Sequence, residues 1–141
     1  MDLDDKFAVL KQVFESQMPV NKFLGLEVLE LKDGFAKIHI PFKEEFIGDF
    51  IQKRWHGGIQ ASIADSAGGI AALTSISSFE EKVNTIDMRI DYLLGSEPKD
   101  IYAEAEIIKD GKRIIKVDIK LYHEKNNIIA LARCAFSVLR K

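Results

Sequence analysis

The second half of the chain alternates between apolar and polar residues with the period of a β-strand. Three segments show this pattern, 85–92, 101–107 and 114–121, and an apolar segment, 128–139, follows them. Turn sequences such as "KDGK" and "EKNN" separate neighbouring segments. Alternation over several long segments is typical of an antiparallel sheet with one covered and one more polar face. Residues 82–139 are therefore predicted to form a four-stranded antiparallel portion.

The alternation also assigns side chains to the two faces of each strand. In the strand expected at 85–92, one face is apolar and consists of Ile86, Met88, Ile90 and Tyr92. The other face is polar and consists of Thr85, Asp87, Arg89 and Asp91. The pattern thus predicts that Thr85 points away from Ile86 and Met88.

One long segment in the middle of the chain, residues 56–76, has helical periodicity and could cover such a sheet. Small and apolar residues recur there at i, i+3 and i+4. Four small residues spaced by three and four share one face of this helix, namely Ala61, Ala64, Gly68 and Ala72. Side chains of this size let a sheet wrap closely around the helix, which compensates for the low helix propensity of glycine.

Shorter elements are expected before this helix. Residues 1–18 read as an amphipathic N-terminal helix that Pro19 ends. "LEVLEL" and "FAKIHIPF" are strand candidates, and "KDG" between them is a hairpin signal. A looser segment, 43–54, leads into the long helix. The order of helix, two strands, long helix and four strands predicts an α+β protein in which one helix covers a curved sheet.

Length and composition narrow the class of protein. A chain of 141 residues suits a single domain, 1–141. The net charge of -2 gives no electrostatic support for nucleic-acid binding. The acidic, amphipathic N-terminus is unlike a signal peptide, so a cytoplasmic protein without a membrane partner is the expectation. Cys134 is the only cysteine, which excludes an intrachain disulfide, and its apolar strand predicts a packed thiol.

The long helix opens with two glycines, Gly57 and Gly58, and carries one carboxylate, Asp65, among small residues. The first N–H groups of a helix lack intrahelical partners and carry a partial positive charge. Glycine places no side chain over these donors, so a carbonyl oxygen can approach them, as acyl transfer requires for its oxyanion. A carboxylate near an acyl carbonyl can attack it or deprotonate a water.

These two groups cannot act on one carbonyl from the same helix, because seven or eight helical residues span about 10 to 12 Å. If both are catalytic, they come from two chains. Two antiparallel helices across a two-fold axis would bring the start of one beside the middle of the other. The spacing therefore predicts a symmetric homodimer with two shared sites.

The stretch "HGGIQASIADSAGG", with "FIGDFIQKRW" before it and "VNTIDMRIDYL" after it, resembles the hotdog-fold thioesterases of the PaaI-like group. In that group an HGG turn opens the central helix, and an acidic residue follows nine positions after the histidine. His56, Gly57, Gly58 and Asp65 match this spacing. The resemblance covers most of the chain. It implies a hotdog fold, an antiparallel β-sheet wrapped around one long central helix, here with an extra N-terminal helix.

The resemblance also implies a function, the hydrolysis of acyl-CoA thioesters without metal or cofactor. Asp65 would be the nucleophile or general base, and the Gly57 N–H of the other subunit would polarise the thioester carbonyl. His56 would cap and order the turn, and Thr85 would lie near the catalytic water. The implied assembly is a homodimer, often paired into a dimer of dimers.

The residues that would bind substrate are less closely matched to the family. Many relatives carry an asparagine about six residues before the histidine, where this chain has Phe50 with Asp49 beside it. A carboxylate accepts hydrogen bonds but cannot donate as asparagine does. Basic residues are candidates for the CoA phosphates, since arginine suits phosphate. The full set of substrate-binding candidates is Gly58, Asp49, Phe50, Gln60, Ile86, Arg89, Arg113 and Lys116.

Other interpretations stay open at the level of sequence. Asp65 could be a buried acid satisfied by the backbone or a cation, His56 a helix cap without chemistry, and Thr85 an ordinary strand residue. No His, Cys and Asp residues have metal-ligand spacing, and neither GxSxG nor GxGxxG occurs in a suitable context. The main alternative function is a non-catalytic hotdog protein that binds acyl-CoA. A hotdog dehydratase is disfavoured, because no Asp and His pair has the spacing that resembles that group.

Overall fold

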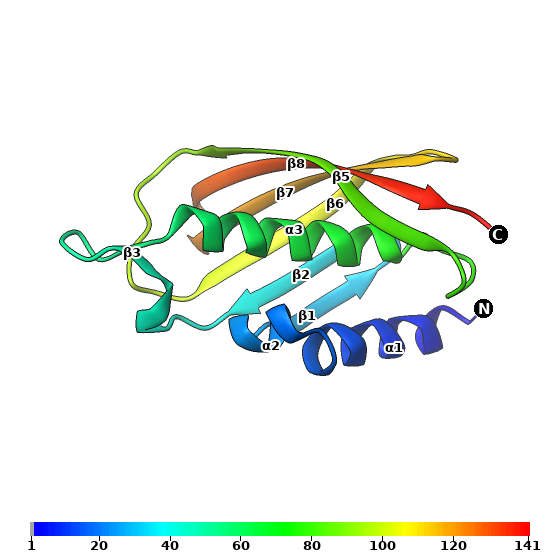
Figure 1. Cartoon of the computed structure of the whole chain (residues 1–141), viewed down its shortest axis with the longest axis horizontal. Helices are drawn as coiled ribbons and strands as arrows, with labels where there is room; N and C mark the ends of the chain where they lie inside the picture. The colour runs from blue at the N-terminus through cyan, green and yellow to red at the C-terminus, as the bar shows by residue number, and fades with distance from the viewer. Residues whose placement is uncertain (1) are drawn as a thin grey trace.

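A computed structural model describes residues 2–141, and it contains a six-stranded antiparallel sheet curved around one long helix (Figure 1). The strand order is β1-β2-β6-β7-β8-β5, which leaves β1 and β5 at the edges. The four strands expected in 82–139 are present, and so is the hairpin around "KDG". The strands of this sheet are β1 (Glu27–Lys32), β2 (Phe35–Ile40), β5 (Lys82–Tyr92), β6 (Ile101–Asp110), β7 (Ile114–Glu124) and β8 (Asn127–Leu139).

The long helix is α3 (Gly57–Leu73), and it crosses the concave face of the sheet (Figure 1). The small residues on one face permit the close contact that the sequence predicts. A Cβ atom at Gly68 would lie 3.2 Å from both Ile119 on β7 and the ring of Phe136 on β8. The apolar core therefore lies between α3 and the concave face of the sheet.

The N-terminal region contains two helices where the sequence predicts one. α1 (Leu3–Ser16) falls within the predicted range 1–18, of which Met1 lies outside the described residues. α2 (Pro19–Leu24) follows it directly. Pro19 starts this second helix as well as separating it from the first, because the fixed φ of proline suits the first position of a helix. Gly25 ends α2 in the left-handed region, with φ 71°.

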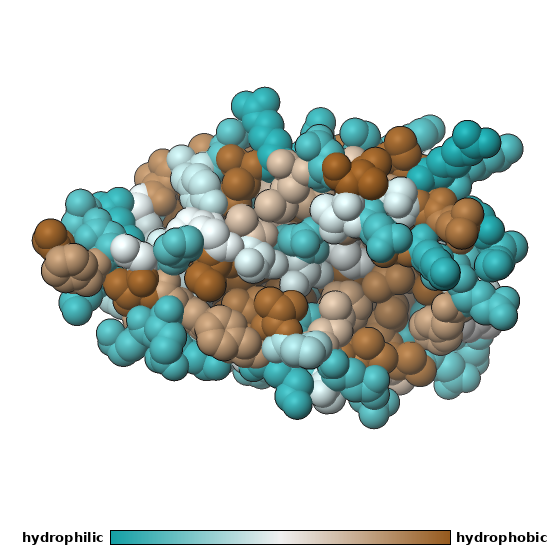
Figure 2. All heavy atoms as spheres, in the orientation of Figure 1, coloured by the Kyte–Doolittle hydropathy of each residue, from teal (hydrophilic) through white to brown (hydrophobic). Residues whose placement is uncertain are grey.

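The segment 43–54 is more ordered than expected and lies just before α3. It contains the 3₁₀ helix η1 (Glu44–Phe46) and two short paired strands, β3 (Ile47–Asp49) and β4 (Arg54–Trp55). The turn between these strands projects from one end of the molecule (Figure 1). Its tip is apolar and exposed to solvent, as the brown spheres at the left of Figure 2 show. Phe50 is 77% exposed and Ile51 is 79% exposed.

β5 contains a bulge that changes which of its side chains face α3. Thr85 and Asp87 pair with consecutive residues of β8, so Ile86 is an extra residue in the strand. Such an insertion reverses the alternation beyond it. Thr85 therefore shares the helix-facing side with Met88, and Ile86 is 54% exposed. The prediction that Ile86 and Met88 share one face, with Thr85 on the other, is wrong for this reason.

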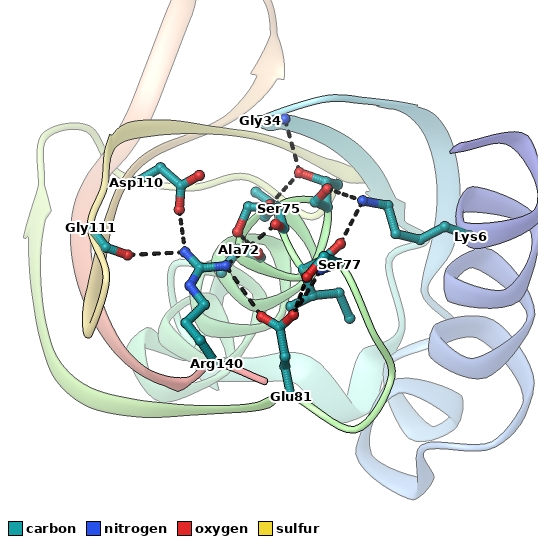
Figure 3. A network of polar contacts seen from close by, with 12 residues as sticks. Lys6, Gly34, Ala72, Ser75, Ser77, Glu81, Asp110, Gly111 and Arg140 are labelled. Atoms are coloured by element: carbon teal, nitrogen blue, oxygen red, sulfur yellow. Dashed lines mark hydrogen bonds and ion pairs between the residues drawn. The ribbon is translucent and has the colours of Figure 1, made fainter. Parts of the chain in front are cut away.

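A polar network joins both ends of the chain to the C-terminal end of α3 (Figure 3). The buried ammonium of Lys6 on α1 donates to the carbonyl of Thr74 at 2.5 Å and to that of Ile76 at 2.9 Å. A cation at this end of a helix is favoured by the helix dipole. The buried Glu81 accepts hydrogen bonds from Ser77 and pairs with Arg140 at 3.3 Å.

None of the helices in residues 2–141 is long and apolar enough to cross a membrane.

Candidate active site

The turn at the start of α3 is organised by His56. His56 is the N-cap residue, and its ring Nδ1 accepts a hydrogen bond from the Gly58 N–H at 2.9 Å. Its own N–H donates to the carbonyl of Phe46 at 2.7 Å, which ties the helix start to the end of η1. Because Nδ1 accepts, the proton of a neutral ring is on Nε2. The capping role expected for His56 is thus present in the structure.

Each glycine of the turn leaves room for a neighbouring ring. A Cβ at Gly57 would lie 3.2 Å from the hydroxyl oxygen of Tyr92 and 3.3 Å from the ring carbon that carries it. A Cβ at Gly58 would lie only 2.8 Å from the ring of His56, closer than real Cβ contacts allow. Gly58 is therefore required by packing within the chain, whereas a Cβ at Gly57 would need only a small shift of the Tyr92 ring.

The Gly57 N–H is a free donor. Among residues 2–141 nothing accepts a hydrogen bond from it, whereas the other backbone polar groups of residues 56–58 have partners. The free N–H lies at the positive end of a helix of 17 residues. Such a donor can stabilise an oxyanion on a carbonyl oxygen that comes within hydrogen-bonding distance.

Asp65 lies two turns further along α3, and its partner is a hydroxyl group. The Thr85 hydroxyl donates to Asp65 Oδ1 at 2.8 Å. No Lys, Arg or His nitrogen in the described part of the chain forms an ion pair with Asp65. Asp65 is half-buried, and Oδ2 has no hydrogen-bond partner among residues 2–141. The carboxylate therefore keeps one oxygen available for a water or a carbonyl carbon.

Both groups face the edge strand of the sheet. Thr85 on β5 contacts Asp65, and Tyr92 at the end of β5 donates its hydroxyl proton to the Gly57 carbonyl at 2.5 Å. Within one chain, Gly57 and Asp65 are about 12 Å apart along the helix axis. The structure thus places the turn of His56, Gly57 and Gly58 beside one end of β5. It places Asp65 beside Thr85, further along the same strand.

The substrate-binding candidates near the helix start are less closely grouped. Gln60 is buried, and its amide lies 3.5 Å from the hydroxyl of Ser96 in the β5–β6 loop. Asp49 Oδ1 accepts the N–H groups of Ile51 and Gln52, each at 3.0 Å, so this oxygen stabilises the β3–β4 turn. Phe50 beside it is exposed at the tip of that turn. The roles predicted for these residues and for Ile86 in substrate binding stay predictions.

The three basic candidates lie apart from the turn within one chain. Arg89 lines a groove of about 540 Å³ on the sheet face opposite α3, together with Asp118 and Arg133. Arg113 is in the β6–β7 turn, and Lys116 is an exposed residue of β7. Their predicted contact with CoA phosphates stays a prediction.

Two features of the site were missed by sequence reasoning. Tyr92 was placed on the apolar face of its strand, but no sequence signal connected its hydroxyl with Gly57. The bulge at Ile86 has no signature in the alternation, because both neighbouring residues fit a regular strand.

Cys134 is buried as expected, and burial raises the pKa of its thiol to about 12. The described residues contain no group of three His, Cys, Asp or Glu side chains arranged for a metal ion.

Comparison with known proteins identifies the family. Residues 52–130, more than half of the chain, match the model of the thioesterase superfamily. The chain belongs to the thioesterase superfamily. A putative esterase from Saccharolobus solfataricus is 29% identical to this chain. The match covers 98% of this chain and 96% of the esterase. The medium/long-chain acyl-CoA thioesterase YigI from Salmonella typhimurium is 27% identical, over 90% of each protein.

Solved structures agree on the architecture. The PaaI protein of the E. coli phenylacetic acid degradation operon superposes with a TM-score of 0.85, over 98% of this chain and 96% of that protein. At 21% identity this likeness shows the fold alone. The superfamily member described here has the hotdog fold and resembles the PaaI-like group, as its HGG motif and spaced acid predict.

Proposed function

We propose that this chain is an acyl-CoA thioesterase, which hydrolyses an acyl-CoA to a carboxylic acid and the CoA thiol. The hydrogen bond from Thr85 to Asp65 carries the proposal, because it orients a carboxylate that has no cationic partner and leaves Oδ2 free. The free Gly57 N–H supplies a donor for the carbonyl oxygen. The acyl-CoA thioesterase activity in the name of the Salmonella relative supports this substrate class.

Asp65 can act in two ways that the geometry supports equally. As a general base, Oδ2 removes a proton from a water whose oxygen attacks the carbonyl carbon, and the thiolate leaves from the tetrahedral intermediate. As a nucleophile, Oδ2 attacks the carbonyl carbon, and the thiolate leaves from the tetrahedral intermediate to give a mixed anhydride of Asp65 and the acyl group. Water then hydrolyses that anhydride and releases the carboxylic acid. In both routes the carbonyl oxygen becomes an oxyanion that the Gly57 N–H stabilises.

The proposal requires a homodimer, since Gly57 and Asp65 of one helix are too far apart for one carbonyl. β5 is an edge strand of 11 residues, and it runs beside both groups. Antiparallel pairing of two β5 edges around their midpoint would lay the Thr85 end of one on the Tyr92 end of the other. Asp65 would then approach the partner's Gly57. Pairing of two dimers and a cytoplasmic location also stay predictions.

The second candidate function is acyl-CoA binding without hydrolysis. The engagement of Asp49 in its own turn favours this alternative, as does the outward position of Phe50. Neither residue supplies the amide that many relatives carry at this place. This alternative keeps the fold and the substrate class but assigns no chemistry to Asp65.

Thiol release from a panel of short-chain, long-chain and phenylacyl-CoA substrates tests the proposal with the wild type and Asp65→Asn. We expect hydrolysis by the folded variant to fall at least about a hundredfold. Equal, slow release by both proteins would exclude Asp65 as the catalytic group. Ligand binding under those conditions would then establish the binding protein.

A second pair of variants tests the carbonyl-polarising N–H. Gly57→Pro removes the N–H, and proline is favoured at the first helical position. His56 already has ψ 132°, which the residue before a proline prefers. Gly57→Ala keeps the N–H and adds the same Cβ beside Tyr92. We expect Gly57→Pro to lose about a hundredfold or more in kcat relative to Gly57→Ala, whereas equal rates would exclude this role.

A further inference from the structure

The end of β5 holds the turn that carries the proposed carbonyl-polarising N–H. The Tyr92 hydroxyl donates to the Gly57 carbonyl oxygen at 2.5 Å. The tyrosine ring also occupies the space beside the Gly57 Cα where a side chain would otherwise lie. Tyr92 is itself held at the strand end, since it pairs with Ala130 and the next N–H donates to Ile129 at 2.8 Å. The contact is therefore between two well-anchored elements.

We propose that Tyr92 is a positioning residue that aims the Gly57 N–H at the substrate carbonyl, an inference that rests on the proposed function. Glycine has more backbone freedom than any other residue, so a catalytic glycine needs restraint from outside. His56 restrains the turn on both sides of Gly57, through Phe46 and Gly58. Tyr92 contributes the hydrogen bond to the Gly57 residue itself.

This restraint matters because the oxyanion donor works through preorganisation. A donor that is already aimed at the developing charge needs no reorganisation during the reaction. Residual motion of Gly57 would misalign the N–H, and small misplacements near the reacting atoms reduce rates strongly. Burial raises the pKa of the Tyr92 hydroxyl further above its ordinary value, which favours the protonated form that donates this hydrogen bond. β5 thus orients both groups of the site, Asp65 through Thr85 and Gly57 through Tyr92.

Tyr92→Phe tests the inference, because it removes the hydroxyl and keeps the ring against Gly57. We expect kcat for acyl-CoA hydrolysis to fall about tenfold, because a less restrained donor is misaligned with the oxyanion. KM should be unchanged, and the variant should be folded at the assay temperature. Tyr102→Phe is the matched control. Tyr102 lies on β6, stacked between His39 and Tyr122 on the outer side of the sheet, and its variant should keep the wild-type kcat.

The ¹⁵N order parameter of the Gly57 amide provides a readout that is independent of activity. We expect Tyr92→Phe to lower it, from the range of rigid backbone at about 0.85 toward that of a flexible turn. An unchanged kcat together with an unchanged order parameter overturns the inference. A rise in KM with kcat unchanged also overturns it. So does a fall in kcat that matches the fraction of unfolded protein at the assay temperature, because a purely structural role predicts that result.

The same experiments separate failure of the inference from failure of the proposed function. If the wild type hydrolyses no thioester, the proposed function is wrong, and the order parameter alone decides whether Tyr92 restrains Gly57. If the wild type is active and Asp65→Asn is not, but Tyr92→Phe matches the wild type in both readouts, only the inference is wrong.

Discussion

At the scale of single residues, Asp65 and Thr85 form the contact on which the proposed chemistry depends. A carboxylate on a helix face of small residues needs a partner when it is half-buried. The hydroxyl of Thr85 meets this need without the strong charge pairing that a cation would bring. The free Oδ2 then remains able to accept a proton or attack a carbonyl carbon. Thr85 therefore orients Asp65 without neutralising it.

Substitution of Thr85 tests this role. Thr85→Val keeps the shape and removes the hydroxyl, so Asp65 loses its only hydrogen-bond donor within the described chain. We expect kcat to fall about tenfold, in line with one lost hydrogen bond to a charged group. Thr85→Ser restores the hydroxyl and should keep at least half of the wild-type kcat. Steady-state hydrolysis of the best acyl-CoA substrate measures both, and equal loss in the two variants would contradict the role.

At the scale of helices and strands, the main feature is the packing of α3 against the sheet. Gly68 and Gly69 are neighbours in this helix, but their surroundings differ. A Cβ at Gly68 would be 3.2 Å from Ile119 and Phe136, whereas one at Gly69 would be 3.8 Å from Phe136, which is ordinary contact. Only Gly68 is therefore required by the close packing of the sheet on the helix.

This difference predicts that the same substitution changes stability differently at two adjacent positions. Gly69→Ala should raise the free energy of unfolding by about 1 kcal/mol, because alanine has the higher helix propensity and no clash results. Gly68→Ala should gain less or lose stability, because its Cβ displaces the ring of Phe136 and the side chain of Ile119. Urea unfolding at a fixed protein concentration measures both variants. A larger gain at Gly68 than at Gly69 would contradict the packing argument.

At the scale of the whole molecule, a partly buried polar network connects both ends of the chain with the C-terminal end of α3 (Figure 3). Hydrogen bonds from Ser77 hold the pKa of Glu81 below its usual value, and Arg140 acts in the same direction. A carboxylate with a lowered pKa stabilises the folded state above its unfolded pKa. That contribution is lost as the pH falls through the folded-state pKa. Arg140, the residue before the C-terminal Lys141, is thereby coupled to the fold.

Glu81→Gln tests this coupling. Above about pH 4.5, the ordinary value for Glu81, the variant should be less stable than the wild type by about 1–3 kcal/mol, because a buried charged hydrogen bond is lost. The difference in the free energy of unfolding should shrink as the pH falls below that value. Glu80→Gln, at an exposed neighbouring position, is the control and should match the wild type. A stability difference that does not change with pH would contradict the assignment.

The shared site of the proposed dimer can be tested by mixing two inactive proteins. Asp65→Asn and Gly57→Pro each remove one group from both sites of a homodimer. In a mixed dimer one of the two sites has both groups intact. Its Asp65 comes from the Gly57→Pro chain, and its Gly57 comes from the Asp65→Asn chain. After subunit exchange in a 1:1 mixture, we expect about a quarter of the wild-type activity. No recovery in a mixture shown to contain mixed dimers would exclude a site shared in this way.

The sequence by itself determined the main features of the fold, and it indicated where the proposed site lies. Period-2 alternation predicts the four strands of 82–139, because side chains of a strand point alternately to opposite faces. The small-residue face of α3 predicts close contact with the sheet, and the glycines with the spaced acid single out the start of the helix. All of these signals are local in the chain, so they can be read without knowledge of the tertiary structure.

The tertiary structure alone decided which side chains meet across the site. The bulge at Ile86 brings Thr85 to Asp65, and Tyr92 reaches Gly57 from the far end of the same strand. A bulge arises from the pairing of two strands distant in sequence, so the alternation within one strand cannot reveal it. The physical reason is that register and side-chain contacts are properties of packed pairs of elements.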